Sequence, residues 1–169
     1  MGNRKRLLIV GAGLLAAGLL TWRLWPRNLS QVLGAELRQV RSMACSASVS
    51  GMSEGEAVID SYVLQDLSPE QADFQAVMEI LDSTGYRPDF RNLLPWPVNR
   101  VGAEGSRQSA SVTLAWGSGA AESAAVTLQS DRQTVISPGG VERLLIFHPT
   151  DRGTLNELTA YLQAHGDAS

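Results

Sequence analysis

An unbroken apolar run near the start of the chain constrains the fold more than any other feature. Residues 7–20, LLIVGAGLLAAGLL, contain no polar side chain, and Trp22 and Trp25 follow them. A helix over residues 7–25 would be about 28 Å long, close to the thickness of a hydrocarbon core of about 30 Å. Tryptophans at the end of such a helix are typical of the membrane–water interface. The sequence therefore predicts a transmembrane helix over residues 7–25.

The basic residues on either side of this run predict its orientation. Arg4, Lys5 and Arg6 precede the run, whereas Arg23 and Arg27 follow it. Flanks with more lysine and arginine stay on the cytoplasmic side. We therefore expect a single-pass protein of the cell membrane with the bulk of its chain extracytoplasmic. The expected parts are a cytoplasmic tail (1–6), the transmembrane helix (7–25), a juxtamembrane segment (26–38), an extracytoplasmic domain (39–166) and a short tail (167–169).

The same run contains a glycine pattern similar to a dinucleotide-binding fingerprint. Gly11, Gly13 and Ala16 follow Leu-Leu-Ile-Val in the pattern G-x-G-x-x-A. The fingerprint also needs an acidic residue about 20 positions later, at the end of a second strand. The first acidic residue is Glu36, and Trp-Arg-Leu-Trp-Pro rather than a strand comes before it. We therefore predict no nucleotide site.

A cleaved signal peptide is an alternative interpretation of the run. A basic start followed by a stretch of apolar residues fits one. However, Trp22, Arg23 and Trp25 stand where small residues would form the cleavage site. Lipid attachment fits less well, because Arg6 occupies the position of the serine or threonine in a myristoylation site. The sequence thus favours an uncleaved anchor.

The part of the chain beyond the run is acidic. All 17 acidic residues lie after residue 27, together with nine of the 14 basic ones, which gives this part a net charge near −8. Nucleic-acid-binding domains present a basic face instead, so nucleic acid is not expected as a partner. The only lysine is Lys5, which excludes lysine nucleophiles from the outer part. The single cysteine, Cys45, permits no internal disulfide, and no cofactor is predicted.

Hydrophobic periodicity predicts an α+β domain after the anchor. Apolar residues alternate with small polar ones from Met43 to Val49, as expected of a strand with one buried face, and a returning strand follows. Ser68 and Gln71 form a capping-box pattern ahead of an apolar helical stripe. Gly85 is the expected left-handed terminator of this helix.

Four further strands and a second helix are predicted downstream. The strands cover residues 109–116, 124–128, 134–137 and 141–147, and the helix is capped by Thr150 or Asp151 and closed by Gly166. The predicted order is β-β-α-β-β-β-β-α. Strands and helices with one apolar side each suit a two-layer α+β domain. We therefore expect an antiparallel sheet of about six strands with two helices packed on one face.

Two residues could serve as the nucleophile of a small cell-envelope hydrolase. Ser53 lies in Gly-Met-Ser-Glu-Gly, which matches the G-x-S-x-G elbow, with His148 and Asp131 as conceivable partners. The elbow requires a strand followed by a helix, whereas two strands are predicted here. Cys45 falls on the apolar face of a strand, and no histidine has metal-ligand spacing. We therefore predict no catalytic residue and no metal site.

Residues 86–107 form the best candidate for a binding site. The segment shows no periodicity, contains several prolines and is longer than a simple connection in a compact domain. It is locally basic, and arginine and aromatic side chains dominate the energetics of interfaces. The alternative is structural: the segment folds back over the sheet and its arginines remain in solvent. The predicted binding residues are Tyr86, Arg87, Phe90, Arg91, Trp96 and Arg100.

The order of these features resembles a group of single-pass membrane proteins of Gram-positive bacteria that have no assigned function. The resemblance rests on the anchor and on Leu-Ser-x-Val-Leu-Gly, Gly-Tyr-Arg-Pro and Asn-Leu-Leu-Pro-Trp, and it covers nearly the whole chain. It implies an extracytoplasmic α+β domain and brings no activity with it. We therefore expect a non-catalytic binding or accessory domain with an envelope protein as partner. A structural membrane subunit that pairs through Gly13 and Ala17 is a further alternative.

Overall fold

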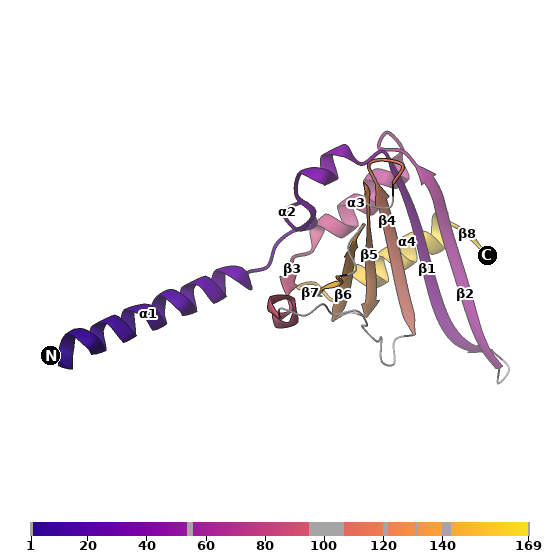
Figure 1. Ribbon diagram of the computed structural model, residues 1–169. Helices are drawn as coiled ribbons and strands as arrows, with labels where there is room; N and C mark the ends of the chain where they lie inside the picture. Colours follow the sequence, from indigo (N-terminus) through magenta and orange to yellow (C-terminus); the bar gives the residue numbers. More distant parts are fainter. Residues whose placement is uncertain are drawn as a thin grey trace.

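The computed structural model describes residues 2–53, 56–94, 107–119, 122–130, 132–139 and 143–168. Within these ranges, the strands form one antiparallel sheet in the order β3-β7-β6-β5-β4-β1-β2-β8 (Figure 1). The strands are β1 (Ser42–Ser53), β2 (Glu56–Leu67), β3 (Tyr86–Pro88), β4 (Gln108–Ala115), β5 (Ser123–Ser130), β6 (Gln133–Pro138), β7 (Leu145–Pro149) and β8 (Asp167–Ala168). β1 joins the β1–β2 hairpin to the meander of β4 to β7.

The α+β class with an antiparallel sheet is confirmed, but the described residues form eight strands rather than about six. The extra strands, β3 and β8, lie at opposite edges of the sheet and contain only three and two residues. Strands this short carry no alternating hydrophobic pattern, so periodicity does not reveal them. Each is held by a partner far away in the chain, because β3 pairs with β7 and β8 pairs with β2.

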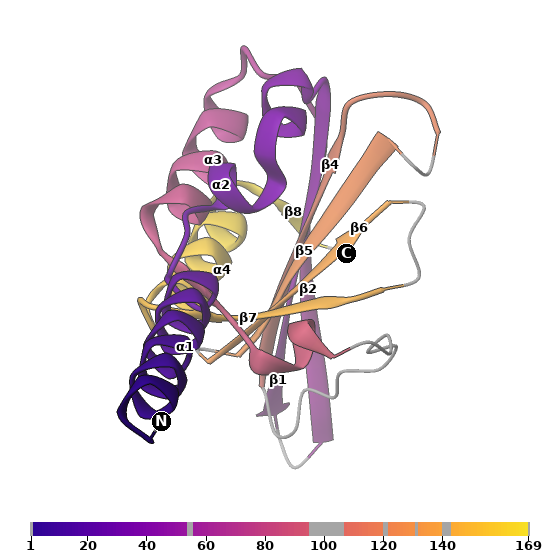
Figure 2. The same ribbon diagram turned by 60° about the vertical axis from the view of Figure 1, so that its left-hand side comes forward.

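Helices cover one face of the sheet. α2 (Leu29–Leu33), α3 (Ala72–Ser83) and α4 (Thr154–His165) lie together on this face, and a short 3₁₀ helix, η1 (Gly34–Gln39), follows α2 (Figure 2). α4 packs on α3 and on β1, β2, β4 and β5. The predicted pair of helices on one face, α3 and α4, is therefore confirmed, and α2 joins them.

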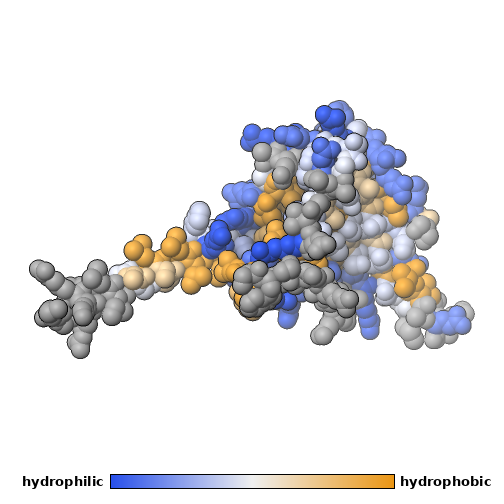
Figure 3. Space-filling model, in the orientation of Figure 1, coloured by the Kyte–Doolittle hydropathy of each residue, from blue (hydrophilic) through white to orange (hydrophobic). Residues whose placement is uncertain are grey.

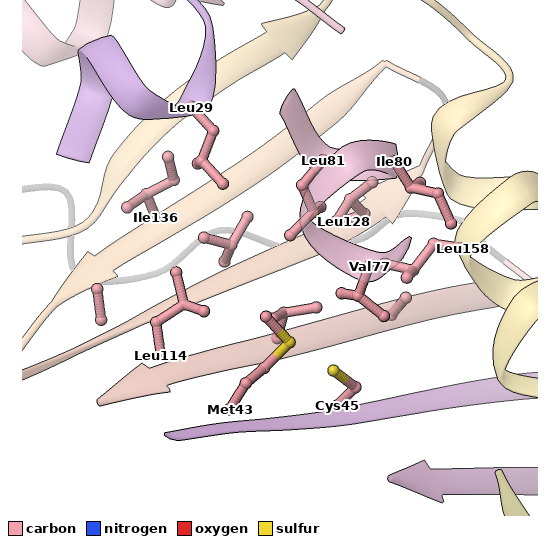
Figure 4. Packing of buried hydrophobic residues seen from close by; sticks show 14 of the residues in the cluster. Leu29, Met43, Cys45, Val77, Ile80, Leu81, Leu114, Leu128, Ile136 and Leu158 are labelled. Carbon is pink, nitrogen blue, oxygen red and sulfur yellow. The ribbon is translucent and has the colours of Figure 1, made fainter. Parts of the chain in front are cut away.

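The core lies between these helices and the sheet. Val77 and Leu81 of α3, and Leu158 and Leu162 of α4, are fully buried, as their helical spacing predicts. β1, β4 and β5 contribute alternate apolar side chains from the other side, and Figure 4 shows them gathered between the strands and α3. Cys45 is one of them. Each layer thus buries the apolar face that its sequence pattern predicts.

α3 and α4 both begin later in the chain than the capping residues in the sequence predict. α3 begins at Ala72, and Ser68 is not its N-cap. Instead, the Gln71 side chain accepts a hydrogen bond of 2.7 Å from the Ser68 backbone N–H, which closes a turn ahead of the helix. α4 begins at Thr154 with Gly153 at its N-cap, so the predicted cap at Thr150 or Asp151 is wrong as well.

Of the two glycines that were expected to end these helices, Gly166 is the C-cap of α4 as predicted, whereas α3 ends with Thr84 at its C-cap, one residue before Gly85. Gly166 has a φ of −86°, and a Cβ at this position would lie 2.6 Å from the Leu162 carbonyl oxygen. Glycine is needed there because the end of α4 approaches β2 closely. A Cβ on Gly85 would lie 3.0 Å from the Thr150 hydroxyl, and Gly85 does not have a positive φ. The left-handed conformation predicted for Gly85 is therefore wrong.

The chain enters the core ahead of residue 39, where the domain was expected to begin. Asn28 caps α2 through a complete capping box with Gln31. Leu29 and Leu33 are 0 % and 7 % exposed and belong to the same core cluster as α3 and α4. The segment predicted as juxtamembrane, residues 26–38, therefore contributes to the folded core.

α1 (Gly2–Arg23) extends away from the domain as a single helix (Figure 1). Its large apolar side chains from Val10 to Leu20 are exposed, and Figure 3 shows a hydrophobic surface along the helix that reaches the domain. In the described part of the chain, no helix is both long enough and apolar enough to cross a membrane. The glycine pattern at Gly11 and Gly13 lies inside α1 rather than in a turn between a strand and a helix.

Candidate functional site

The chain that leaves α1 meets a distant segment at β3. The backbone N–H of Arg27 donates to the carbonyl oxygen of Tyr86 over 3.1 Å, and the N–H of Tyr86 donates to the Arg27 carbonyl oxygen over 2.6 Å. Pro26 also lies against Gly85, where a Cβ would be 3.3 Å from that of Pro26. The start of the predicted binding segment therefore lies beside the end of α1 (Figure 1).

Tyr86 is part of the core rather than of the surface. Its side chain is 0 % exposed, its hydroxyl donates to the Leu81 carbonyl oxygen over 2.7 Å, and its ring packs edge-to-face on Phe147. Burial raises the pKa of the hydroxyl, and the negative charge of Asp82 acts in the same direction. Tyr86 thus fixes β3 on the domain. Its prediction as a binding residue is wrong, because it offers no surface to a partner.

A buried carboxylate organises the chain after β3. Asp89 is 6 % exposed, and its oxygens accept hydrogen bonds of 2.8 to 2.9 Å from the backbone and guanidinium N–H groups of Arg91. His148 Nε2 lies 2.8 Å from Oδ2 of the same carboxylate. The side-chain hydrogen bonds from Arg91, more than any other contact, hold the pKa of Asp89 well below its ordinary value and raise that of Arg91. Asp89 is therefore a fully paired carboxylate at neutral pH.

His148 links this carboxylate to another part of the sheet. Its Nδ1 lies 2.7 Å from the carbonyl oxygen of Arg132, while its Nε2 faces Asp89. The two ring nitrogens thus contact a backbone carbonyl and a carboxylate, which are both hydrogen-bond acceptors. Asp89 and His148 are 59 residues apart in the chain, which is why the sequence gives no reason to pair them.

A short 3₁₀ helix, η2 (Phe90–Leu93), follows β3 and pairs with β7 at Ile146, just beyond the residues that β3 reaches. The Asn92 side chain donates to the Ile146 carbonyl oxygen over 2.7 Å and accepts from the Ile146 N–H over 2.9 Å. This pair of hydrogen bonds imitates one step of a β-ladder. The Arg143 guanidinium donates to the carbonyl oxygens of Asn92 and Leu94. The polar groups of η2 are therefore used to hold it on the sheet.

The apolar side chains of η2 face outward beside α1. Phe90 and Leu93 are 65 % and 43 % exposed. Leu93 lines a groove of about 330 Å³ together with the end of α1, and a second groove of about 200 Å³ shares Arg23 and Leu93 with the first. We call the surface formed by Leu19, Leu20, Trp22, Arg23, Arg27 and Leu93, which line these grooves, the junction surface. Phe90 is exposed beside it, three residues before Leu93 and therefore on the same side of the 3₁₀ helix.

The two nucleophiles considered and not predicted, Ser53 and Cys45, line neither groove. Ser53 is the last residue of β1, and the chain then returns as β2, so the turn between a strand and a helix that a nucleophile elbow needs is not formed. Cys45 is 1 % exposed, and burial raises the pKa of its thiol to about 12. Such a thiol is inert at neutral pH. Of the suggested partners, His148 belongs to the network above, and Asp131 lies outside the described residues.

The remaining predicted binding residues differ in their accessibility. Arg87 and Phe90 are exposed, and Arg91 keeps 36 % of its side-chain surface while it is held by its ion pair. Trp96 and Arg100 lie outside the described residues. The structure thus leaves two predicted contacts fully available and one partly available.

Sequence reasoning missed residues of two kinds. In the sequence, Leu93 looks like cover for the sheet, and Trp22 and Arg23 look like parts of the anchor alone, although all three line one groove. Asp89 and Asn92 show no periodic signal, because each acts through hydrogen bonds to partners that the sequence does not place. Asp89, two residues before Arg91, is the one local signal for the turn in which an aspartate side chain accepts a hydrogen bond from the backbone N–H two residues later.

The chemistry that this region offers is contact through apolar and cationic groups. Its buried polar groups are paired with one another, and its exposed side chains are aromatic, aliphatic or arginine. Within the ranges that the structure describes, no three histidine, cysteine, aspartate or glutamate side chains come together as metal ligands. No known protein family, curated protein or solved structure matches the chain.

Proposed function

We propose that the protein is a single-pass, membrane-anchored extracytoplasmic domain that binds a component of the cell envelope beside the membrane and has no catalytic role. The observation that carries this proposal is the backbone bridge between Arg27 and Tyr86. It ties the start of the predicted binding segment to the end of α1, so that Leu93 lies next to Trp22. A surface in this position is available to partners at the membrane.

The character of α1 supports the anchor. From Val10 onward its large apolar side chains are exposed, which is unfavourable in water and favourable in a hydrocarbon core. Trp22 and Trp25 are 66 % and 65 % exposed, and the Arg27 guanidinium lies 5.9 Å from the centre of the Trp22 ring. Tryptophan and arginine together suit the headgroup region. The side chains of residues 7–9 lie outside the described ones, so the length of the span rests on the sequence.

Binding fits the polar groups of the β3–η2 segment better than catalysis does. Asp89 is occupied by Arg91 and His148, and the Asn92 amide is occupied by the Ile146 backbone. A catalytic acid or base needs a polar atom within reach of the substrate. Since these side chains are engaged in holding η2, the groups that remain for a partner are those of the junction surface.

The anchor is tested by disrupting the centre of α1. Leu14→Arg is expected to move the protein from the membrane pellet to the soluble fraction after alkaline carbonate extraction, because arginine at the centre of a span costs about 3 kcal/mol of insertion free energy. Leu14→Ile is the matched control and should remain in the pellet. Protease added outside intact cells should remove the domain of the unaltered protein. Release of the unaltered protein by carbonate, or protection of its domain in intact cells, would contradict the proposal.

The binding surface is tested by photocrosslinking in cells. A photoreactive residue in place of Leu93, which lines both grooves, should give a discrete crosslinked species with a protein or lipid of the envelope. The same group in place of Asn156, which is exposed on α4, should give none. Mass spectrometry of the purified protein measures both. Equal yields at the two positions, or no product at position 93, would count against a binding role for this surface.

A further inference from the structure

We propose that the envelope component bound by the junction surface is the lipid bilayer itself: Phe90 and Leu93 dock into the outer leaflet beside α1 and hold the domain in one orientation on the membrane. This inference rests on the anchoring proposed above and gives its unspecified partner a chemical identity. The occupant of the two grooves is then lipid, with acyl chains against the leucines and phosphate groups against the arginines.

The distribution of exposed apolar side chains is the first argument. Among the described residues, large exposed apolar side chains occur on α1, at Val58 and Ile59 of β2, and at Phe90 and Leu93 of η2. β2 lies toward the opposite edge of the sheet from β3. Of the two groups outside α1, η2 is the one that meets the helix, because Leu93 lines the same groove as Leu20. A surface that continues a membrane anchor meets the same lipid.

The depth of Leu93 along α1 is the second argument. Leu93 shares its groove with Leu19 and Trp22 of α1, which are three residues and about 4.5 Å apart along the helix axis at 1.5 Å per residue. The headgroup region of each leaflet is about 5 to 8 Å thick. With Trp22 in the headgroup region, where tryptophan is typical, Leu93 lies beside the level at which headgroups meet acyl chains. An aliphatic side chain is favourable at that level, and an exposed position in water is not.

The charges at this end of the domain are the third argument. Arg23 and Arg27 line the grooves, and no described acidic side chain lines either of them. The acid of the segment, Asp89, is buried and paired with Arg91. Guanidinium groups bind phosphate oxygens through several donors at once. The remainder of the domain is acidic and is repelled by anionic lipid, so this end is the one that approaches the bilayer.

The rigidity of η2 is the fourth argument. Asn92 and Arg143 hold the backbone of η2 on β7, and Asp89 fixes the turn that leads into it. A segment that is already ordered loses little conformational entropy when it docks. Phe90 and Leu93 are thus presented in a fixed position relative to α1.

The test places one fluorophore at three positions of the full chain. Cys45 is buried and unreactive, so an introduced cysteine takes the label selectively. The variants Phe90→Cys, Leu14→Cys and Ile59→Cys are labelled in detergent and reconstituted into vesicles of phosphatidylcholine and phosphatidylglycerol that carry nitroxide groups on their acyl chains. Ile59 is the matched control, because it is 66 % exposed, close to the 65 % of Phe90, but lies on β2.

Docking predicts about a twofold or larger fall in fluorescence at positions 14 and 90 and no fall at position 59, since interfacial side chains reach about 5 to 10 Å into the leaflet. Leu93→Asp added to the Phe90→Cys variant should remove the quenching at position 90, whereas Ile59→Asp should leave it unchanged.

Each other outcome shows whether the anchor or the lipid docking is contradicted. Quenching at position 14 without quenching at position 90 overturns lipid docking and leaves the anchor standing, as expected for a surface that binds a protein. Absence of quenching at position 14 overturns the anchor, and lipid docking with it. Equal quenching at positions 59 and 90 means that the domain lies on lipid without a preferred surface, which also overturns the inference.

Discussion

The centre of the sheet and its β3 edge are built in different ways. At the centre, β1, β4 and β5 bury alternate apolar side chains under α3 and α4, and Val112, Val126 and Leu158 have no exposed surface. At the edge, a three-residue strand is fixed by the backbone of Arg27 and by the network around Asp89. The centre is stabilised by burial of apolar surface, which does not depend on direction. The edge is stabilised by hydrogen bonds, which require particular distances and angles.

The centre of the sheet therefore stabilises the fold, whereas the β3 edge sets the orientation of exposed side chains. Burial accommodates small shifts of side chains, whereas hydrogen bonds to a carboxylate or an amide fix distances and angles. The edge can therefore set the position of Phe90 and Leu93 relative to α1. We expect changes at the centre to weaken the whole domain and changes at the edge to act locally.

The largest effect is expected at the centre. Leu158→Ala removes a fully buried side chain between α4 and the sheet and should lower the free energy of unfolding by about 3 kcal/mol. Gln163→Ala, at an exposed position of the same helix, should change it by less than about 0.5 kcal/mol. Urea unfolding of the protein in detergent, followed by circular dichroism, measures both. Similar losses in the two variants would mean that α4 does not pack as described.

A smaller and more local effect is expected at the edge. Asp89→Asn removes the charge that Arg91 and His148 face, and it should lower the free energy of unfolding by about 2 kcal/mol. Amide hydrogen exchange should accelerate at Tyr86 more than at Val126, because the edge opens while the centre stays closed. Asp167→Asn, at an exposed position, is the control. Uniform acceleration at both amides would erase the distinction between edge and centre.

Acid is expected to weaken the edge before the centre. The pKa of Asp89 is lower in the folded protein than in the unfolded chain, where it is about 3.9. Its contribution to stability is therefore present above that value and is lost as the pH falls toward the folded pKa. The stability difference between the unaltered protein and Asp89→Asn should shrink between about pH 5 and pH 2. Urea unfolding across this range measures the difference, and a constant value would exclude a paired carboxylate.

The smallest effect on stability is expected on the surface of η2. Phe90→Ser, at a side chain 65 % exposed, should change the free energy of unfolding in detergent by less than about 0.5 kcal/mol. Phe147→Ser, at a side chain 5 % exposed on β7, should cost about 3 kcal/mol or more. Urea unfolding separates the two. A large loss with Phe90→Ser would show that Phe90 packs against the domain rather than facing outward.

The parts of the fold with a repeating pattern could be predicted from the sequence. The strands from Met43 to Val49 and from residue 109 onward, and the apolar stripes of α3 and α4, follow periods of two and of three to four, which directly reflect burial of one face. Local signals were less reliable at the helix ends: Gly166 caps α4 as predicted, whereas α3 ends with Thr84 at its C-cap, and Gly85 after it is fitted to its neighbours in space.

The sequence predicted which segment contains the candidate site, but not which residues of that segment are exposed. Residues 86–107 drew attention as a long segment without periodicity, and the described part of it does meet the end of α1. Tyr86 and Phe90 are both aromatic residues of this segment, yet one is buried and the other exposed. What separates them is the pairing of Arg27 with Tyr86, a contact between distant positions for which a single sequence holds no signal.

α4 covers β1, β2, β4 and β5, yet it follows all four of them in the chain. A ribosome therefore delivers the apolar face of the sheet before the helix that shields it. Until Thr154 and the residues after it have emerged, the nascent polypeptide leaves those strands open to chaperones and degrading proteases. A premature stop codon ahead of that position would thus produce material for clearance rather than a smaller working domain.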